Sequence, residues 1–226
     1  MLVHNTSGNR QTTWNSFSPL LSNAGYCVFA PTVGALPGPW PVAAIGAMGP
    51  VVPSSHQLGA FVDEVLALTG AEKVDLIGHS QGTLIAAYWI RSSSGADKVD
   101  RVVSLAPLWK GSDVVSGEGI ARDVQFLACP ACIDMMPGSD FLKSFEASGM
   151  FVDSVEYTNI LTATDTTVKP YTSGYAEAPN VTNIILQEVC PSAETSHLGM
   201  LADRLTASLM LSVLDENVPA PTDCID

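Results

Sequence analysis

The chain has 226 residues, of which 46% are apolar and 15% charged, and its 23 acidic and 10 basic residues give a net charge of −13. This length allows one sizeable core and is short for two domains. The acidic balance, without a cluster of Lys and Arg, argues against nucleic-acid binding and against electrostatic docking on an anionic membrane. No apolar run reaches the roughly 18 residues that a transmembrane helix needs, so we expect no membrane span.

Short apolar runs alternate with helical patterns along the chain. Several of these runs are apolar at nearly every position, as in strands of a sheet that is covered on both faces. The segments between them repeat apolar side chains at helical spacing, and Gly70 marks the end of one such pattern. The expected strands are 1–4, 26–30, 74–78, 99–106, 157–163 and 181–189, and the expected helices are 15–24, 55–69, 80–91 and 200–214.

This alternation predicts an α/β fold with a mostly parallel central sheet, helices on both faces and a single domain over residues 1–226. The opening "MLVH" is typical of the end of a strand, and the first residues lack the basic start and apolar core of a signal peptide. We therefore expect the sequence to begin inside the fold, without N-terminal edge strands.

Two stretches interrupt the alternation. Residues 31–53 are rich in Pro and Gly and are expected to form a long irregular loop. Residues 107–153 are expected to form a lid-like or cap-like insertion, either with a small core of its own or as a funnel for substrate. An apolar surface above the carboxyl edge of a parallel sheet favours an apolar substrate.

The segment Gly78-His79-Ser80-Gln81-Gly82 joins an expected strand to an expected helix. A strand that turns sharply into a helix holds the turn residue in a strained conformation, and small residues at 78 and 82 let the flanking backbone pass closely. The serine hydroxyl then stands above a helix N-terminus. The pattern G-x-S-x-G is weak by itself, but in this setting it predicts a nucleophile elbow with Ser80 as the nucleophile.

A serine hydroxyl needs a base, and the chain has four histidines. His197 lies in the expected loop between the last strand and the last helix, where a catalytic base belongs. His4 is expected to shape a loop and His56 to lie on the surface. His79 neighbours the serine, but its side chain is expected to leave the turn in another direction. We therefore predict His197 as the base.

The base needs a carboxylate that orients its ring and stabilises its charged form. Asp165 follows the expected strand 157–163, so it lies at the same sheet edge as the nucleophile. The chain order Ser80, Asp165, His197 is the order of α/β-hydrolases. The competing carboxylates lie before a strand, within a strand or in a Gly/Pro-flanked loop: Asp153, Glu156, Glu188 and Glu177.

A tetrahedral intermediate needs hydrogen-bond donors for its oxyanion. The N–H of Gln81, the residue after the nucleophile, is one expected donor. The second is expected from the loop after the first strand, and we assign it to the N–H of Thr6, whose hydroxyl is a candidate third donor.

The chain has five cysteines. Cys27 lies in an apolar run and is expected to be a buried free thiol. The pair Cys129 and Cys132 is compatible with a disulfide, a redox pair or half of a zinc site. Zinc would need further ligands at suitable spacing, and a redox pair would need a thioredoxin-like unit. We favour a structural disulfide, which fits an oxidising compartment.

Together these segments resemble the secreted triacylglycerol lipases of the α/β-hydrolase superfamily, both the actinobacterial class 2 lipases and the fungal lipase B of Candida antarctica. The segments that carry the resemblance span nearly the whole chain: "LVHNTSGN", "GHSQG", "KVDRVVSLAP", "LTATDTTVKPYTS", "LQEVCPSAETSHLGM" and "TDC". The class 2 lipases imply a bridge between Cys129 and Cys132, and lipase B implies one between Cys190 and Cys224. The family commonly has His-Gly after the first strand, whereas this chain has His4-Asn5, and Asn adopts a positive φ less freely than Gly.

We therefore predict a secreted serine carboxylic-ester hydrolase that cleaves acylglycerols without a metal or organic cofactor. The expected partners are an ester substrate and, transiently, a lipid–water interface, and the expected oligomeric state is a monomer. A short-chain esterase and a cutinase-like polyester hydrolase are the nearest alternatives. An acyltransferase and a binding protein that has lost catalysis are more distant ones.

Overall fold

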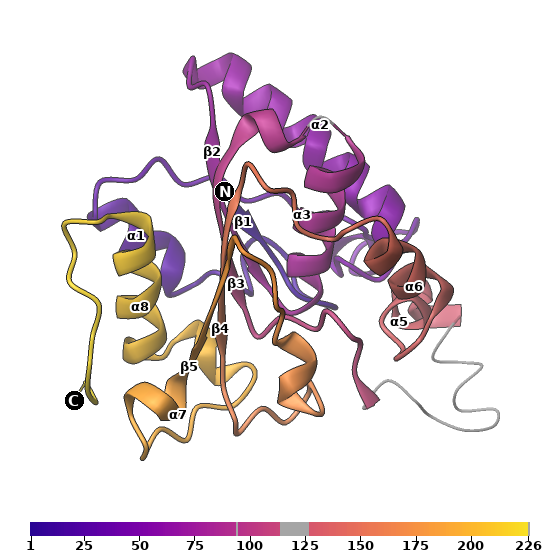
Figure 1. Ribbon diagram of the computed structural model, residues 1–226. Helices are drawn as coiled ribbons and strands as arrows, with labels where there is room; N and C mark the ends of the chain where they lie inside the picture. Colours follow the sequence, from indigo (N-terminus) through magenta and orange to yellow (C-terminus); the bar gives the residue numbers. More distant parts are fainter. Residues whose placement is uncertain (94, 114–126, 226) are drawn as a thin grey trace.

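A parallel sheet forms the centre of the computed structural model, which describes residues 1–93, 95–113 and 127–225. Its five strands lie in the order β1-β2-β3-β4-β5, and each neighbouring pair is parallel. Figure 1 shows the sheet nearly edge-on with helices on both sides, which confirms the predicted fold class. The strands are β1 (Leu2–Val3), β2 (Val74–His79), β3 (Val99–Leu105), β4 (Glu156–Leu161) and β5 (Val181–Ile185).

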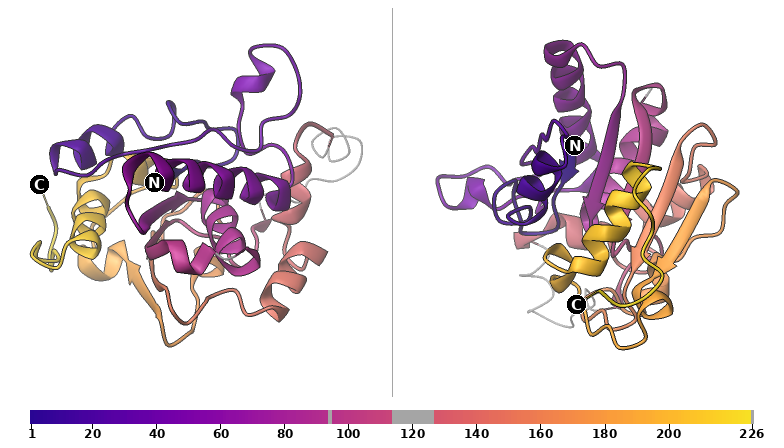
Figure 2. Two further views of the ribbon diagram at one scale, coloured as in Figure 1. Left: turned by 90° about the horizontal axis from the view of Figure 1, so that it is seen from above. Right: turned by 90° about the vertical axis from the view of Figure 1, so that its left-hand side faces the viewer.

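Two helical layers cover the sheet. Helices α1 (Phe17–Asn23) and α8 (Arg204–Leu214) lie on one face, and α2 (Val51–Thr69) and α3 (Gln81–Ser92) lie on the other (Figures 1 and 2). Successive strand residues point to opposite faces, so Leu2 packs in the core under α1 and α8 and Val3 in the core under α2 and α3. Within the described residues the remaining helices are short: α5 (Pro130–Asp134), α6 (Asp140–Ala147), α7 (Leu186–Val189) and four 3-10 turns at Val42–Ala44, Gly95–Lys98, Tyr171–Gly174 and Gly199–Leu201.

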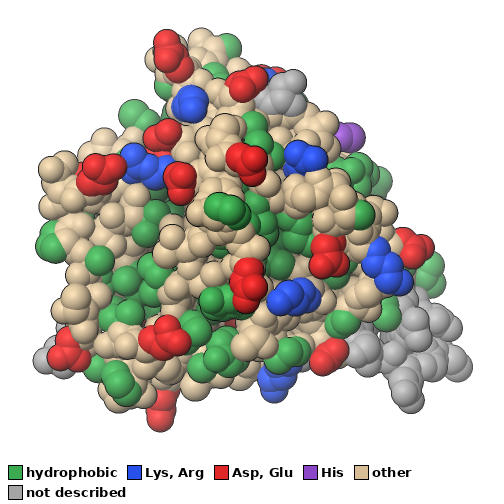
Figure 3. Space-filling view, viewed as in Figure 1, with side chains coloured by type: hydrophobic (Ala, Val, Ile, Leu, Met, Phe, Trp, Pro, Cys, Tyr) green, Lys and Arg blue, Asp and Glu red, His purple; other side chains and the backbone are tan. Residues whose placement is uncertain are grey.

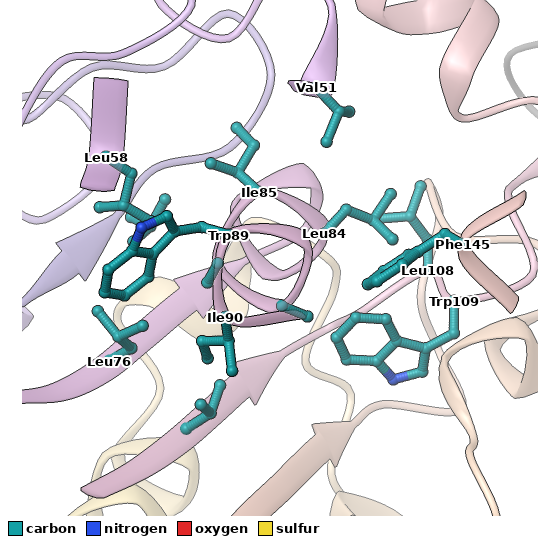
Figure 4. Close-up of a cluster of buried hydrophobic side chains, with 14 of the residues drawn as sticks. Val51, Leu58, Leu76, Leu84, Ile85, Trp89, Ile90, Leu108, Trp109 and Phe145 are labelled. Carbon is teal, nitrogen blue, oxygen red and sulfur yellow. The ribbon is translucent and has the colours of Figure 1, made fainter. Parts of the chain in front are cut away.

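Trp89 of α3 packs at the contact between α2 and α3. Its buried indole lies beside Leu58 of α2 and Leu76 of β2 (Figure 4). A Cβ atom at Gly59 would overlap with the Trp89 ring, so the glycine allows α2 to approach α3 closely. This packing holds α3, and therefore the turn before it, firmly against the sheet.

The described part of the insertion 107–153 shares the main core. Leu142 and Phe145, three residues apart on α6, are buried in the same cluster as Leu84 of α3. The ring of Phe145 also lies 5.4 Å from that of Tyr88 on α3. The expectation of a separate small core is therefore wrong, because α6 presents one apolar face and finds its partner on α3. Residues 114–126 lie outside the described residues, and the lid role stays a prediction.

Residues 26–30 do not form the expected strand. Leu2 N–H donates to Phe29 O at 2.9 Å, but β1 has two residues and offers too short an edge for a continuous ladder. Cys27 in this segment is exposed, so the prediction of a buried thiol is wrong.

Several other element boundaries differ from the expected ones, those of α2 and β5 among them. Helix α2 begins at Val51, before the expected start at residue 55, because the carboxylate of the distant Asp134 accepts a hydrogen bond from Val51 N–H at 2.8 Å. The expected strand 181–189 ends at Ile185, and α7 follows it, so Glu188 lies on a helix. Gly70 ends α2 with a φ of 71°, as predicted.

Acidic side chains are spread over the face shown in Figure 3 and do not gather in one patch. Over the ranges 1–93, 95–113 and 127–225, no helix is long and apolar enough to cross a membrane.

Candidate active site

Ser80 occupies the sharp turn between β2 and α3. Its φ and ψ are 55° and −125°, a conformation that a non-glycine residue adopts only when its surroundings enforce it. Ser80 N–H donates to Leu105 O at 2.9 Å, and the Thr83 hydroxyl donates to Ser80 O at 2.7 Å. These bonds hold the strained turn from the β3 side and from the first turn of α3.

The glycines around the turn are required by close backbone approaches. A Cβ atom at Gly82 would overlap with Val3 O of β1, and one at Gly78 would lie 2.9 Å from Thr83 N. Helix α3 therefore starts directly against the sheet, and its N-terminus, which carries a partial positive charge, points at the edge where Ser80 lies. The local geometry is a sharp strand-to-helix turn, and its role as a nucleophile elbow stays a prediction.

Asp165 and His197 form a buried hydrogen-bonded pair. His197 Nδ1 lies 2.8 Å from Asp165 Oδ2, and the two side chains are 4% and 2% exposed. The other carboxylate oxygen, Oδ1, accepts hydrogen bonds from Thr167 N–H at 2.7 Å and Val168 N–H at 2.8 Å. Because a carboxylate oxygen accepts, Nδ1 carries the proton and Nε2 presents its lone pair. This is the tautomer that a general base needs.

The loop that carries His197 is tied to the segment that carries Asp165. Thr195 O accepts hydrogen bonds from the hydroxyls of Thr162 at 2.7 Å and Thr164 at 3.0 Å. Gln187 Nε2 donates to the Thr162 hydroxyl oxygen at 3.0 Å. Sequence reasoning missed Thr162, Thr164 and Gln187. The segment "TAT" directly before Asp165 is the signal that could have suggested hydroxyl contacts at this strand end.

Two backbone N–H groups near Ser80 are available as hydrogen-bond donors. Neither Thr6 N–H nor Gln81 N–H has a hydrogen-bond partner within the described residues. The Thr6 hydroxyl donates to Gln81 Oε1 at 2.6 Å and also lies 3.8 Å from Met135 Sδ. The Gln81 side chain is buried, and its Nε2 has no partner among the described atoms. The structure thus brings both predicted oxyanion residues together.

His4 fixes the peptide unit between Asn5 and Thr6. Its Nε2 accepts a hydrogen bond from Val33 N–H at 3.1 Å, so its Nδ1 carries the proton and donates to Asn5 O at 3.0 Å. Gly8 N–H donates to the same oxygen at 3.1 Å. Since the peptide is planar, holding its carbonyl end also orients the Thr6 N–H at its other end. Burial lowers the pKa of His4, which favours this neutral form.

Asn5, which stands where the family commonly has glycine, does not have a positive φ. The residue with a positive φ in this loop is Ser7, at 58°. The Asn5 side chain instead accepts a hydrogen bond from the Thr13 hydroxyl at 2.7 Å and donates to Thr6 O at 2.9 Å. Asn5 therefore stabilises the loop through its amide.

Ser80 is linked to the acid–base pair through its neighbour. Within the described residues no hydrogen bond joins the Ser80 hydroxyl to His197. The His79 ring lies 4.7 Å from the His197 ring, measured between centroids, and both are buried. Catalytic hydrogen bonds are often long before substrate binds. His56, by contrast, is exposed on α2, as expected.

Both cysteine pairs named from the resemblance are bridged. Cys129 is joined to Cys132 at the start of α5, and Cys190 is joined to Cys224 across a sequence separation of 34. The second bridge closes the His197 loop against the C-terminal tail. Among the described residues, no group of three or more His, Cys, Asp or Glu could hold a metal ion.

The fold and the elbow define an α/β protein of the hydrolase type, and sequence comparison agrees. The chain belongs to the alpha/beta hydrolase fold family, whose sequence profile matches residues 6–146. This confirms the resemblance to α/β-hydrolases that the elbow and the strand-end residues indicate.

Three known lipases are similar to this chain. Lipase B of Pseudozyma antarctica is 28% identical over 155 residues, which cover 65% of this chain and 44% of that protein. Lipase B of Aspergillus fumigatus superposes with a TM-score of 0.79 at 20% identity, over 98% of this chain and 53% of that chain. The mature lipase BlEst2 of Bacillus licheniformis superposes with a TM-score of 0.66 at 16% identity, over 94% of this chain and 90% of that chain. The chain thus spans about half the length of the two lipase B relatives.

Proposed function

We propose that the protein is a serine carboxylic-ester hydrolase that acts on acylglycerols. The observation that carries the proposal is the buried Asp165–His197 pair, at 2.8 Å, at the same sheet edge as a serine held at φ 55° on a strand-to-helix turn. A strained serine and an oriented imidazole at one sheet edge serve nucleophilic catalysis better than any structural purpose. The names of the three similar lipases support the same activity.

In this proposal Ser80 Oγ attacks the ester carbonyl carbon while His197 Nε2 takes the hydroxyl proton. Asp165 stabilises the imidazolium ion that forms. The carbonyl oxygen becomes an anion and accepts hydrogen bonds from Thr6 N–H and Gln81 N–H. The ester C–O bond then breaks, and the leaving oxygen receives the proton from His197. An acyl-enzyme remains on Ser80.

Water completes the proposed cycle by the same steps. His197 Nε2 takes a proton from water as its oxygen attacks the acyl carbon, and the same N–H groups bind the second oxyanion. The bond between Ser80 Oγ and the acyl carbon breaks, and Oγ regains its proton from His197 while the acid leaves. No step needs a group outside this chain, the ester and water.

The direct test is hydrolysis of a soluble p-nitrophenyl ester by the wild type and by Ser80→Ala. We expect kcat to fall by at least about 10⁴-fold, because the attacking atom is removed. Ser92→Ala, an exposed position at the other end of α3, is the matched control and should keep the wild-type rate. Retention of activity by Ser80→Ala would refute the proposed nucleophile.

The acylglycerol assignment has its own test, because a short-chain esterase or polyester hydrolase would use the same residues. Rates are measured with esters of increasing acyl-chain length, above and below the concentration at which each substrate aggregates. A lipase gains activity with long chains above that limit, whereas an esterase is most active on short soluble esters.

We also propose that the protein is secreted and that it touches a lipid–water interface as a monomer. The bridges Cys129–Cys132 and Cys190–Cys224 support an oxidising compartment. Reduction by a glutathione buffer of cytosolic strength, followed by thiol counting, tests whether both bridges persist only under oxidising conditions. Sedimentation tests the oligomeric state.

A further inference from the structure

His79 is a buried histidine beside the nucleophile that the proposed mechanism does not use. It is 0% exposed, and its Nε2 lies 3.0 Å from the backbone oxygen of His197. Because a carbonyl oxygen accepts, Nε2 must carry the proton. Nδ1 is then a lone-pair nitrogen, and it has no partner among the described atoms. His79 is therefore a neutral ring with one hydrogen-bond donor, and this donor binds the backbone oxygen of His197, the proposed base.

Two carbonyl groups of the loop around His197 accept hydrogen bonds from the segments that carry the proposed acid and the proposed nucleophile. Thr195 O accepts from the hydroxyls of Thr162 and Thr164, which lie three residues and one residue before Asp165. His197 O accepts from His79, which precedes Ser80 directly. The first carbonyl therefore ties the loop to the segment of the acid, and the second ties it to the turn of the nucleophile.

The hydrogen bonds to Thr195 O and the one to His197 O fix His197 relative to different residues. The threonine bonds and the Asp165–His197 bond keep the base aligned with the acid. The His79 bond is the hydrogen bond that joins the base loop to the elbow within the described residues, so it is the one that fixes His197 relative to Ser80. Without the donor, His197 O would be a carbonyl at a buried residue with no partner, and the loop would shift to satisfy it.

We propose that His79 is a positioning residue, which sets the distance between the His197 ring and the Ser80 hydroxyl through its hydrogen bond to His197 O. This inference rests on the proposed function, because it concerns the base and the nucleophile named there. It assigns His79 a role that differs from the expectation that its side chain points away from the chemistry.

The charge state of His79 suits this role. Burial, and to a smaller extent the nearby His197, lower the pKa of His79 to about 3. His79 therefore stays neutral while His197 takes a proton during the reaction. A cation at a ring centroid distance of 4.7 Å would oppose that protonation, and a neutral ring does not.

Two substitutions separate the donor of His79 from its ring. His79→Phe keeps a flat ring and removes the donor, and Nδ1 has no partner to lose. His79→Gln removes the ring and places an amide N–H close to the position of the histidine Nε2. The control is His56→Phe, the same change at an exposed histidine.

With a soluble p-nitrophenyl ester, we expect His79→Phe to lower kcat by roughly 10- to 100-fold, as a displaced catalytic group does, with KM unchanged. The acid limb of its pH–rate profile should coincide with that of the wild type, because the Asp165 bond remains. His79→Gln should regain most of the loss, and His56→Phe should match the wild type. A wild-type kcat in His79→Phe overturns the proposal, and so does an equal loss in His79→Gln.

A measurement on the wild type keeps the proposal testable if a variant does not fold. Nitrogen NMR of labelled histidines should find His79 as the neutral tautomer protonated at Nε2, and the opposite tautomer overturns the proposal. This result does not depend on activity. Failure of the proposed function is recognised separately, by an active Ser80→Ala.

Discussion

The acid–base half of the candidate site and its oxyanion half are held in different ways. In the first half, side chains do the fixing: Asp165 accepts three hydrogen bonds, and Thr162 and Thr164 hold the loop of the base. In the second half, the proposed donors are the backbone N–H groups of Thr6 and Gln81, which every substitution except proline keeps. The side chains of His4 and Asn5 nevertheless hold the loop of Thr6. The difference implies that substituting the functional residues themselves affects the acid–base half far more than the oxyanion half.

Among variants that keep Ser80, the largest effect should come from Asp165→Asn. The amide would donate to His197 Nδ1 instead of accepting from it, which places the ring proton on Nε2 and removes the lone pair that takes the serine proton. We expect kcat for a soluble ester to fall by about 10⁴-fold with little change in KM. Steady-state kinetics measure this.

The control for Asp165→Asn is Asp153→Asn, an exposed carboxylate before β4 that sequence reasoning rejected as the acid. It should behave as the wild type. If Asp153→Asn and Asp165→Asn lost the same activity, the assignment of the acid would be wrong, and the acid–base half would not be the more sensitive one.

Each half also contains one buried neutral histidine, His79 on one side and His4 on the other. Burial lowers both pKa values below the ordinary 6.5, and that of His79 to about 3. Below about pH 6.5 the unfolded chain binds protons that the folded chain does not, so stability present at higher pH is lost as the pH falls. For His79 the loss between about pH 7 and about pH 5 is about 2 kcal/mol.

Urea unfolding of the wild type and His79→Phe at these two pH values measures this contribution. The wild type should lose about 2 kcal/mol more of its free energy of unfolding than the variant does. His56→Phe, which removes an exposed histidine, should follow the wild type. Parallel pH dependences for His79→Phe and the wild type would show that His79 is not held neutral by burial.

The residues that sequence reasoning found and those that it missed differ in physical origin. The placement of Ser80, Asp165 and His197 at one sheet edge could be predicted because each follows a strand, and the carboxyl ends of parallel strands meet at one edge. The bond from His79 to His197 and the bond from Asp134 to the start of α2 connect residues 118 and 83 positions apart. Such contacts depend on how loops pack and leave no local pattern. The exposure of Cys27 was not predicted for the same reason, because an apolar run alone does not show whether a neighbouring strand covers it.

The smallest expected effect concerns the Thr6 hydroxyl. It donates to Gln81 Oε1 at 2.6 Å, so it can reach an oxyanion only by giving up that bond, and the two contributions partly cancel. We expect Thr6→Val, which keeps the branched shape and the backbone N–H, to lower kcat by about tenfold, less than the 10²- to 10³-fold loss typical of a dedicated donor. Thr6→Ser keeps the hydroxyl and should approach the wild type. A loss in Thr6→Val as large as that in Asp165→Asn would mean that the oxyanion half depends on a side chain after all, and that the two halves are equally sensitive to substitution.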